Sequence, residues 1–148
     1  MWSKRVIAWN GTAFAYFVMA FPVLAADPVG IWLTEDGKAR VRIYACGEAL
    51  CGTVLSLKEP NDPDTGRPKL DKFNKDTSKN ARPVVGIELI TGLKPNGTPG
   101  QWQGSLYNPE DGNNYIGIST VDGLLSLKLQ GCVFGGLICK SETWKRTN

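Results

Sequence analysis

The 148-residue chain contains no histidine. This absence excludes catalytic systems in which histidine activates a serine or cysteine nucleophile, and it excludes zinc sites with histidine ligands. It also removes the side chain that most often acts as a general base near neutral pH. We therefore predict a protein that is not an enzyme and that needs no cofactor.

Strong net charge is also lacking. The whole chain has 17 basic and 14 acidic residues; without Lys4 and Arg5, which lie in the N-terminal segment, 15 basic residues remain against 14 acidic ones. A near-neutral surface has no long-range attraction for nucleic acid or anionic lipid. We expect no nucleic-acid partner, and we expect any partner to be recognised by shape and local contacts.

Residues 1–26 have the pattern of a secretory signal peptide: two basic residues, an apolar run and the small residues Ala25 and Ala26. We predict an N-terminal signal helix that is removed near Ala25 or Ala26, which leaves one domain at residues 27–148 and no stable membrane span. The protein would then be periplasmic or secreted. A retained N-terminal anchor is the alternative, because the apolar run is about as long as a membrane span.

All four cysteines lie in residues 27–148. An even number of cysteines in a small exported domain predicts disulfides. The local pairings Cys46–Cys51 and Cys132–Cys139 are favoured because each pair brackets a turn, and each would contribute about 2 kcal/mol in the chain-entropy model. A metal site of four thiolates is the alternative, but neither pair has the CxxC spacing of zinc sites. We expect no metal.

Apolar and polar side chains alternate in several short runs, as they do in β-strands. Glycine, proline and asparagine turns separate these runs and divide the chain into eight strands, near residues 29–34, 38–46, 51–57, 84–91, 100–107, 114–121, 124–132 and 137–146. Such a chain predicts an all-β fold, an eight-stranded antiparallel up-and-down barrel, with a two-sheet sandwich as the alternative. A barrel of this size is filled by side chains or holds one small ligand. The candidate interior residues are Val41, Ile43, Val85, Ile87, Leu89, Trp102 and Leu106.

Residues 58–82 form one long loop, in which Leu70 and Phe73 are the only large apolar residues. Loops of this length are usually functional or disordered. It is either a solvated loop over one barrel end or a lid whose Phe73 and Leu70 face the cavity mouth. Asp71, Asn74 and Arg82 either order the loop through Asx turns and an aspartate–arginine pair or belong to a binding site. Asp62 to Gly66 lacks the closing glutamate of a calcium loop.

Two further motifs have mainly structural interpretations. Residues 107–115, Tyr-Asn-Pro-Glu-Asp-Gly-Asn-Asn-Tyr, are rich in turn-forming residues, so we expect Tyr107, Asp111 and Gly112 to shape a turn instead of a binding loop. Gly30-Ile31-Trp32 opens the domain and Trp144-Lys145-Arg146 closes it. This pair is similar to the calycin (lipocalin-like) pattern, and the resemblance implies that Arg146 stacks on Trp32 at one barrel end while Trp144 also supports the fold.

The motifs together resemble one family more closely. The order is Gly30-x-Trp32, Val41-x-Ile43-x-x-Cys46-Gly47-x-x-Leu50-Cys51-Gly52, Asp71-x-x-Asn74, Arg82-Pro83 and Gly86, followed by the 107–115 motif, Gly131-Cys132 and Cys139-x4-Trp144. This order is similar to that of the bacterial domain-of-unknown-function 2147 family, small exported proteins with lipocalin-like barrels. The resemblance covers residues 28–146 and implies the fold, but no biochemical activity.

Two functions from different classes fit these observations. The first is an exported protein that binds a small apolar molecule among the interior residues under the loop. The second is a protein-interaction or inhibitor module of the envelope, with a filled core and exposed contacts such as Phe73, Arg82 and Tyr107. An enzyme based on carboxylates is a third possibility, but nothing places Glu88 and Glu142 at a common cleft.

Overall fold

The computed structural model describes residues 17, 19 and 27–148. The predicted signal helix and its cleavage site lie outside the described residues. Within the described part of the chain, no helix is both long enough and apolar enough to cross a membrane.

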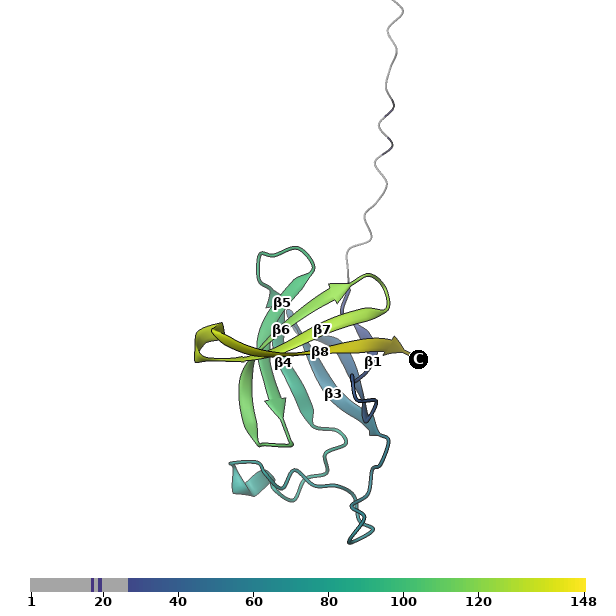
Figure 1. The fold of residues 1–148 in the computed structure, drawn as a ribbon, viewed down its shortest axis with the longest axis vertical. Helices are drawn as coiled ribbons and strands as arrows, with labels where there is room; N and C mark the ends of the chain where they lie inside the picture. Colours follow the sequence, from purple (N-terminus) through teal and green to yellow (C-terminus); the bar gives the residue numbers. More distant parts are fainter. Residues whose placement is uncertain (1–16, 18, 20–26) are drawn as a thin grey trace, which may run out of the picture.

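The chain forms a closed barrel of eight antiparallel strands, each hydrogen-bonded to the next and the last paired with the first (Figure 1). This arrangement confirms the predicted all-β, up-and-down fold. The strands are β1 (Gly30–Leu33), β2 (Ala39–Cys46), β3 (Ala49–Leu57), β4 (Glu88–Pro95), β5 (Gln101–Asn108), β6 (Asn113–Asp122), β7 (Ser126–Val133) and β8 (Ile138–Thr147). Two short 3-10 turns complete the described elements, η1 (Thr77–Lys79) in the long loop and η2 (Phe134–Gly136) between β7 and β8.

The prediction was wrong at the start of β4. The sequence placed Val85, Ile87 and Leu89 on one face of a strand from residue 84, but the strand begins at Glu88. The Ile87 N–H donates to the carbonyl of Val84, and Gly86 at the third position has a φ of 94°, so Val84 to Ile87 forms a tight turn. Val85 is consequently 41% exposed and does not face the barrel interior.

The core fills the barrel with large side chains from most of the strands. Trp32 and Trp144, from the first and last strands, are 0% and 3% exposed. The Arg146 guanidinium lies 4.2 Å from the centre of a Trp32 ring. It also donates to the carbonyl oxygens of Asp27, Val29 and Leu124. The other buried core residues are Val41, Ile43, Ile90, Leu93, Val121, Leu127 and Leu129.

Inward-facing glycines let neighbouring groups occupy the remaining space. Gly104, Gly117 and Gly131 lie opposite one another on β5, β6 and β7. A Cβ atom at Gly104 would lie 2.6 Å from the carbonyl oxygen of Thr91, while Cβ atoms at Gly117 and Gly131 would lie 3.2 and 3.3 Å from Leu106. These positions are therefore filled by the backbone of β4 and by one leucine.

Candidate functional site

Five of the seven residues predicted to line a ligand site lie in the main core cluster or pack against it. Val41 and Ile43 are 0% and 1% exposed, and Leu89, Trp102 and Leu106 pack against the same cluster. Ile87 is buried as well, outside that main cluster. Ile87 is thus buried outside the cluster and Val85 is exposed, and the fully buried residues of β4 are Ile90 and Leu93, which the prediction did not include.

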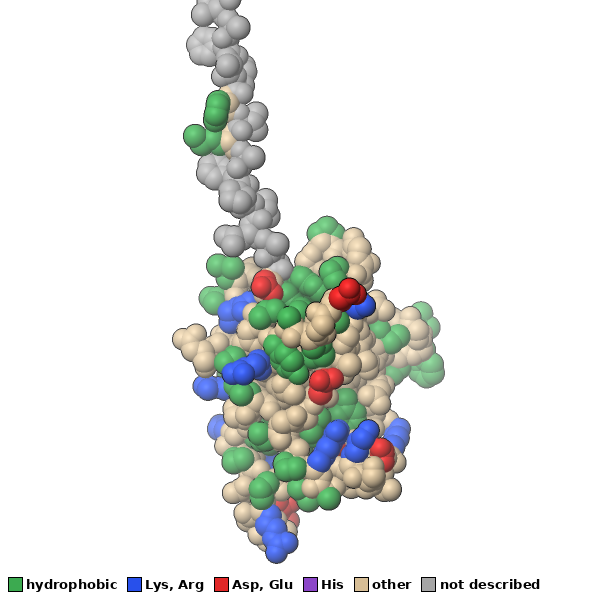
Figure 2. All heavy atoms as spheres, turned by 180° about the vertical axis from the view of Figure 1, so that it is seen from behind, with side chains coloured by type: hydrophobic (Ala, Val, Ile, Leu, Met, Phe, Trp, Pro, Cys, Tyr) green, Lys and Arg blue, Asp and Glu red, His purple; other side chains and the backbone are tan. Residues whose placement is uncertain are grey.

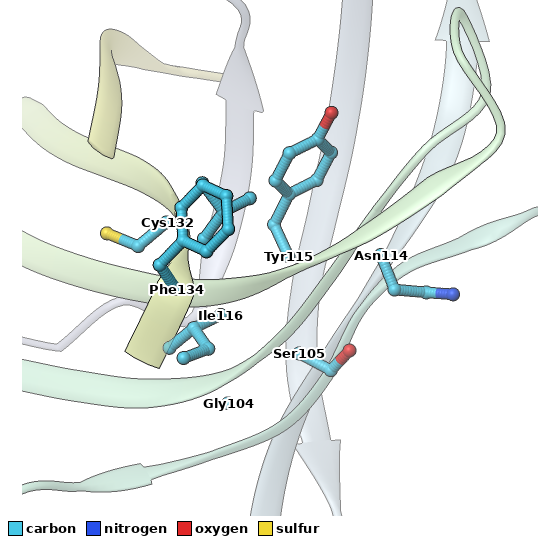
Figure 3. Close-up of a pocket in the computed structure, with 8 residues that line it drawn as sticks. Gly104, Ser105, Asn114, Tyr115, Ile116, Cys132 and Phe134 are labelled. Carbon is cyan, nitrogen blue, oxygen red and sulfur yellow. The ribbon is translucent and has the colours of Figure 1, made fainter. Parts of the chain in front are cut away.

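Two hollows among the described residues are open to solvent. The first, of about 400 Å³, lies beside Ser105, Ile116, Cys132 and Phe134, on strands β5 to β7 and the turn that follows β7 (Figure 3). The second, of about 320 Å³, lies between the β1–β2 turn and the end of β3. Neither is an enclosed chamber at the centre of the barrel.

One polar group inside the barrel has no hydrogen-bond partner among the described residues. Ser119 is 0% exposed, and its hydroxyl oxygen contacts no donor or acceptor. It lies on β6 between Trp102 of β5 and Leu129 of β7. Buried hydroxyls are usually hydrogen-bonded, if only to a water molecule. Ser119 is therefore the interior position best suited to a polar atom from outside the chain.

Asp71 is the centre of the long loop. Its side chain is fully buried, and one carboxylate oxygen accepts from Nε and Nη2 of Arg82, at 2.9 and 2.8 Å, and from Nδ2 of Asn74 at 2.8 Å. The other oxygen accepts from the Tyr107 hydroxyl at 2.6 Å. Burial, together with the hydrogen bond to this carboxylate, raises the pKa of Tyr107 to about 12. Both carboxylate oxygens of Asp71 thus have hydrogen-bond partners, and these bonds hold the loop against the barrel.

The turn between β5 and β6 holds the loop from a second side. A Cβ atom on Gly112 would lie 1.8 Å from the carbonyl oxygen of Phe73, and Gly112 has a φ of 70°, so only glycine fits there. Burial raises the pKa of Asp111, but hydrogen bonds from Tyr115 and Asn113 outweigh it and leave this pKa below its usual value. The turn is therefore ordered and packs against the loop.

The apolar side chains of the loop are only half covered. Phe73 and Leu70 are 53% and 44% exposed. The ammonium group of Lys72 lies 5.2 Å from the centre of the Phe73 ring. The loop is therefore fastened at one end of the barrel, whereas its function as a lid remains a prediction.

The hairpin of β7 and β8 projects from the side of the barrel and forms a surface that was not predicted from the sequence (Figure 1). Phe134, Leu137 and Ile138 at its end are 78%, 84% and 58% exposed; we call these three residues the apolar tip. Figure 2 shows hydrophobic side chains gathered on the projection at the right of the molecule, where this hairpin lies in the reversed view. The Cys132–Cys139 disulfide closes the hairpin at the base of the tip. The available signal was that no polar side chain occurs between these cysteines, where four large apolar residues flank two glycines.

The second disulfide joins Cys46 to Cys51 across the turn between β2 and β3. Both cross-links are therefore local, and each pair brackets a single turn. No group of three or more potential metal-binding side chains of His, Cys, Asp or Glu occurs among the described residues.

A closed eight-stranded barrel with an early Gly-x-Trp strand and an arginine from the last strand over the indole has the architecture of a lipocalin-like fold. Consistent with this class, the fold is similar to a solved structure described as "Protein HP1028 from the human pathogen Helicobacter pylori belongs to the lipocalin family". The TM-score is 0.69 at 22% sequence identity, over 83% of this chain and 84% of that one. The chain belongs to the family "Uncharacterized protein conserved in bacteria (DUF2147)", whose model matches residues 30–146. No curated protein matches the sequence.

Proposed function

We propose that this protein is a non-catalytic binding protein of the bacterial envelope that binds another protein through its outer surface, with the apolar tip as the main contact. The observation that carries the proposal is the contrast between a filled barrel and an exposed tip. The interior is occupied by tryptophans, aliphatic side chains and close backbone contacts at glycines. The tip, in contrast, exposes three large apolar side chains at one place.

The tip is suited to docking because it is already ordered. Its ends are joined by the Cys132–Cys139 disulfide, so the segment has few conformations to lose when it binds. An exposed aromatic side chain beside aliphatic ones is typical of residues that anchor protein interfaces. Two local disulfides also suit an oxidising compartment, which supports an exported location.

The carboxylates considered for catalysis have local hydrogen bonds. Glu88 accepts from the hydroxyl of Thr91, and Glu142 accepts from the indole N–H of Trp144. Glu88 lies at the start of β4 and Glu142 on β8, strands that are not neighbours in the barrel. This arrangement supports a binding function without catalysis.

The test is to place a photo-crosslinking amino acid at Leu137 and to illuminate living cells. The control has the same amino acid at Leu125, which is 70% exposed in the turn between β6 and β7. We expect a discrete cross-linked protein from position 137 and none from position 125. The double substitution Phe134→Ser and Leu137→Ser should weaken binding to the partner so identified by at least tenfold. Equal cross-linking at both positions would contradict the proposal.

Binding of a small apolar molecule inside the barrel is the second candidate, and the unpaired Ser119 hydroxyl favours it. The lining would be Val41, Ile43, Ile87, Leu89, Trp102 and Leu106, with Phe73 at the mouth. An environment-sensitive fatty-acid fluorophore should then brighten with the protein, and Ser119→Val should change its affinity. If no brightening occurs with a panel of fatty-acid and aromatic probes, interior binding is refuted.

A further inference from the structure

Part of one edge of β8 is covered by no other strand of the described residues. It pairs with β7 along most of its length, from Ile138 to Lys145, but with β1 only at Lys145, Arg146 and Thr147. Residues 138–143 are exposed. The β7–β8 hairpin therefore extends beyond the point at which the barrel is closed, and its outer edge faces solvent.

The register identifies which backbone groups lie on that edge. The Cα atoms of Cys132 and Cys139 are 4.0 Å apart, the spacing of a pair that does not exchange backbone hydrogen bonds. Every second residue of β8 has the same orientation, so Cys139, Ser141 and Thr143 direct their N–H and C=O groups away from β7. The Thr143 N–H supports this assignment, because it donates to the side chain of Glu35 at 2.8 Å. Since that N–H is already paired, the open part of the edge consists of the backbone groups of Cys139 and Ser141 and the C=O of Thr143.

We propose that this edge pairs with the same edge of a second copy of the chain, so that the two β8 strands run antiparallel with Ser141 opposite Ser141. Ordered, unpaired strand edges favour this kind of pairing. The proposal goes beyond the proposed function, because it concerns the strand edge and not the apolar tip.

Charge complementarity selects the second copy as occupant and fixes the register. With Ser141 at the twofold axis, Lys140 of each copy lies opposite Glu142 of the other, and this attraction occurs twice. A register shifted by one residue on each strand, centred on Lys140, would place the two lysines directly opposite each other, which is destabilising. In the proposed register the two Ser141 residues form a hydrogen-bonded pair. Lys140 and the Glu142 of the other copy then form the adjacent non-hydrogen-bonded pair, in which the Cα atoms and side chains lie closer together.

The first experiment measures self-association of the purified, oxidised protein by analytical ultracentrifugation. We expect a reversible dimer, which weakens about tenfold in Lys140→Glu, because both attractive pairs become repulsive. Combining Lys140→Glu with Glu142→Lys should restore the wild-type dissociation constant. A wild-type protein that stays monomeric up to about 1 mM overturns the proposal. So does a dimer that the single substitution leaves unchanged.

A second experiment tests the backbone edge directly. Ser141→Pro removes an N–H that the pairing with β7 does not use, and proline is tolerated at such edge positions. This variant should keep its circular dichroism spectrum and both disulfides but lose the dimer. Ser141→Ala, the control, should keep the fold and the dimer. If Ser141→Pro fails to fold, the charge-swap series decides.

Cross-linking tests the register. Cα atoms of such hydrogen-bonded pairs lie about 5.5 Å apart, which a disulfide can span. Ser141→Cys should therefore oxidise to a covalent dimer much faster than Ser105→Cys, an exposed position on β5, which has paired neighbours on both sides. Equal rates for the two variants would overturn the assignment.

Discussion

Asp71→Asn tests whether one buried carboxylate orders the long loop. The substitution keeps the shape of the side chain but removes its negative charge; with the amide oxygen towards Arg82, the NH2 group faces the Tyr107 hydroxyl, which can accept a hydrogen bond instead of donating one. Removing one partner of a buried ion pair costs about 3–5 kcal/mol. The Arg82 side chain is 38% exposed, so water can solvate its stranded charge, and we expect a smaller loss, about 2–3 kcal/mol. This is a large fraction of the stability of a small domain.

Most of that loss should be local, because Asp71 connects the loop to the barrel through a single side chain, Tyr107. Trypsin is a suitable probe, since the loop is rich in lysine and arginine. We expect cleavage within residues 58–82 at least tenfold faster in Asp71→Asn than in wild type, together with a lower urea midpoint. Asp76→Asn is the matched control, because Asp76 is exposed in the same loop and asparagine caps a helical turn as well as aspartate does. Wild-type protease resistance and an unchanged urea midpoint in Asp71→Asn would refute the reasoning.

Three further predictions concern other contacts. The pKa of Tyr107 is raised in the folded state, so this residue stabilises the fold fully below pH 10, and that contribution is lost as the pH rises towards about 12; absorbance at 295 nm should show a phenol that titrates towards pH 12 in wild type and is missing in Tyr107→Phe. Arg146→Lys should cost about 2 kcal/mol in urea denaturation, because lysine cannot bond three carbonyls and stack on Trp32; a loss below about 0.5 kcal/mol would contradict this. Gly104→Ala should destabilise by about 1–3 kcal/mol although alanine is less flexible than glycine, since its methyl group would overlap a carbonyl oxygen; Ser105→Ala, at the exposed neighbouring position of β5, is the control.

The fold was predictable because alternation and turn residues are local signals. The prediction failed at Val85, where alternation continues through Gly86 although the chain turns there. The close contacts at Gly104, Gly117 and Gly131 were not predictable, since glycine has no side chain to mark the face on which it lies. The hydrogen bond between Tyr107 and Asp71 connects residues 36 positions apart, which come together only in the folded chain.

The apolar tip was missed for a different reason. Residues 133–138 are apolar or glycine, without alternation, and such a run carries no information about which side is covered. The η2 turn, with Phe134 at a φ of 53° and two glycines at positive φ, directs these side chains to solvent. The apolar tip is exposed because of the conformation of this turn, and the periodicity of apolar residues in the sequence does not predict turn conformation.

Closure of the barrel has a consequence for the timing of folding. β1 is joined to β8 by three residue pairs, and the Arg146 contact to Val29 spans 117 positions of the chain. The first strand is therefore made early but has no partner on one side until the last strand has left the ribosome or a translocation channel. A chain stalled before residue 145 would expose an unsatisfied strand and a bare tryptophan, which makes it a natural substrate for chaperones and proteases.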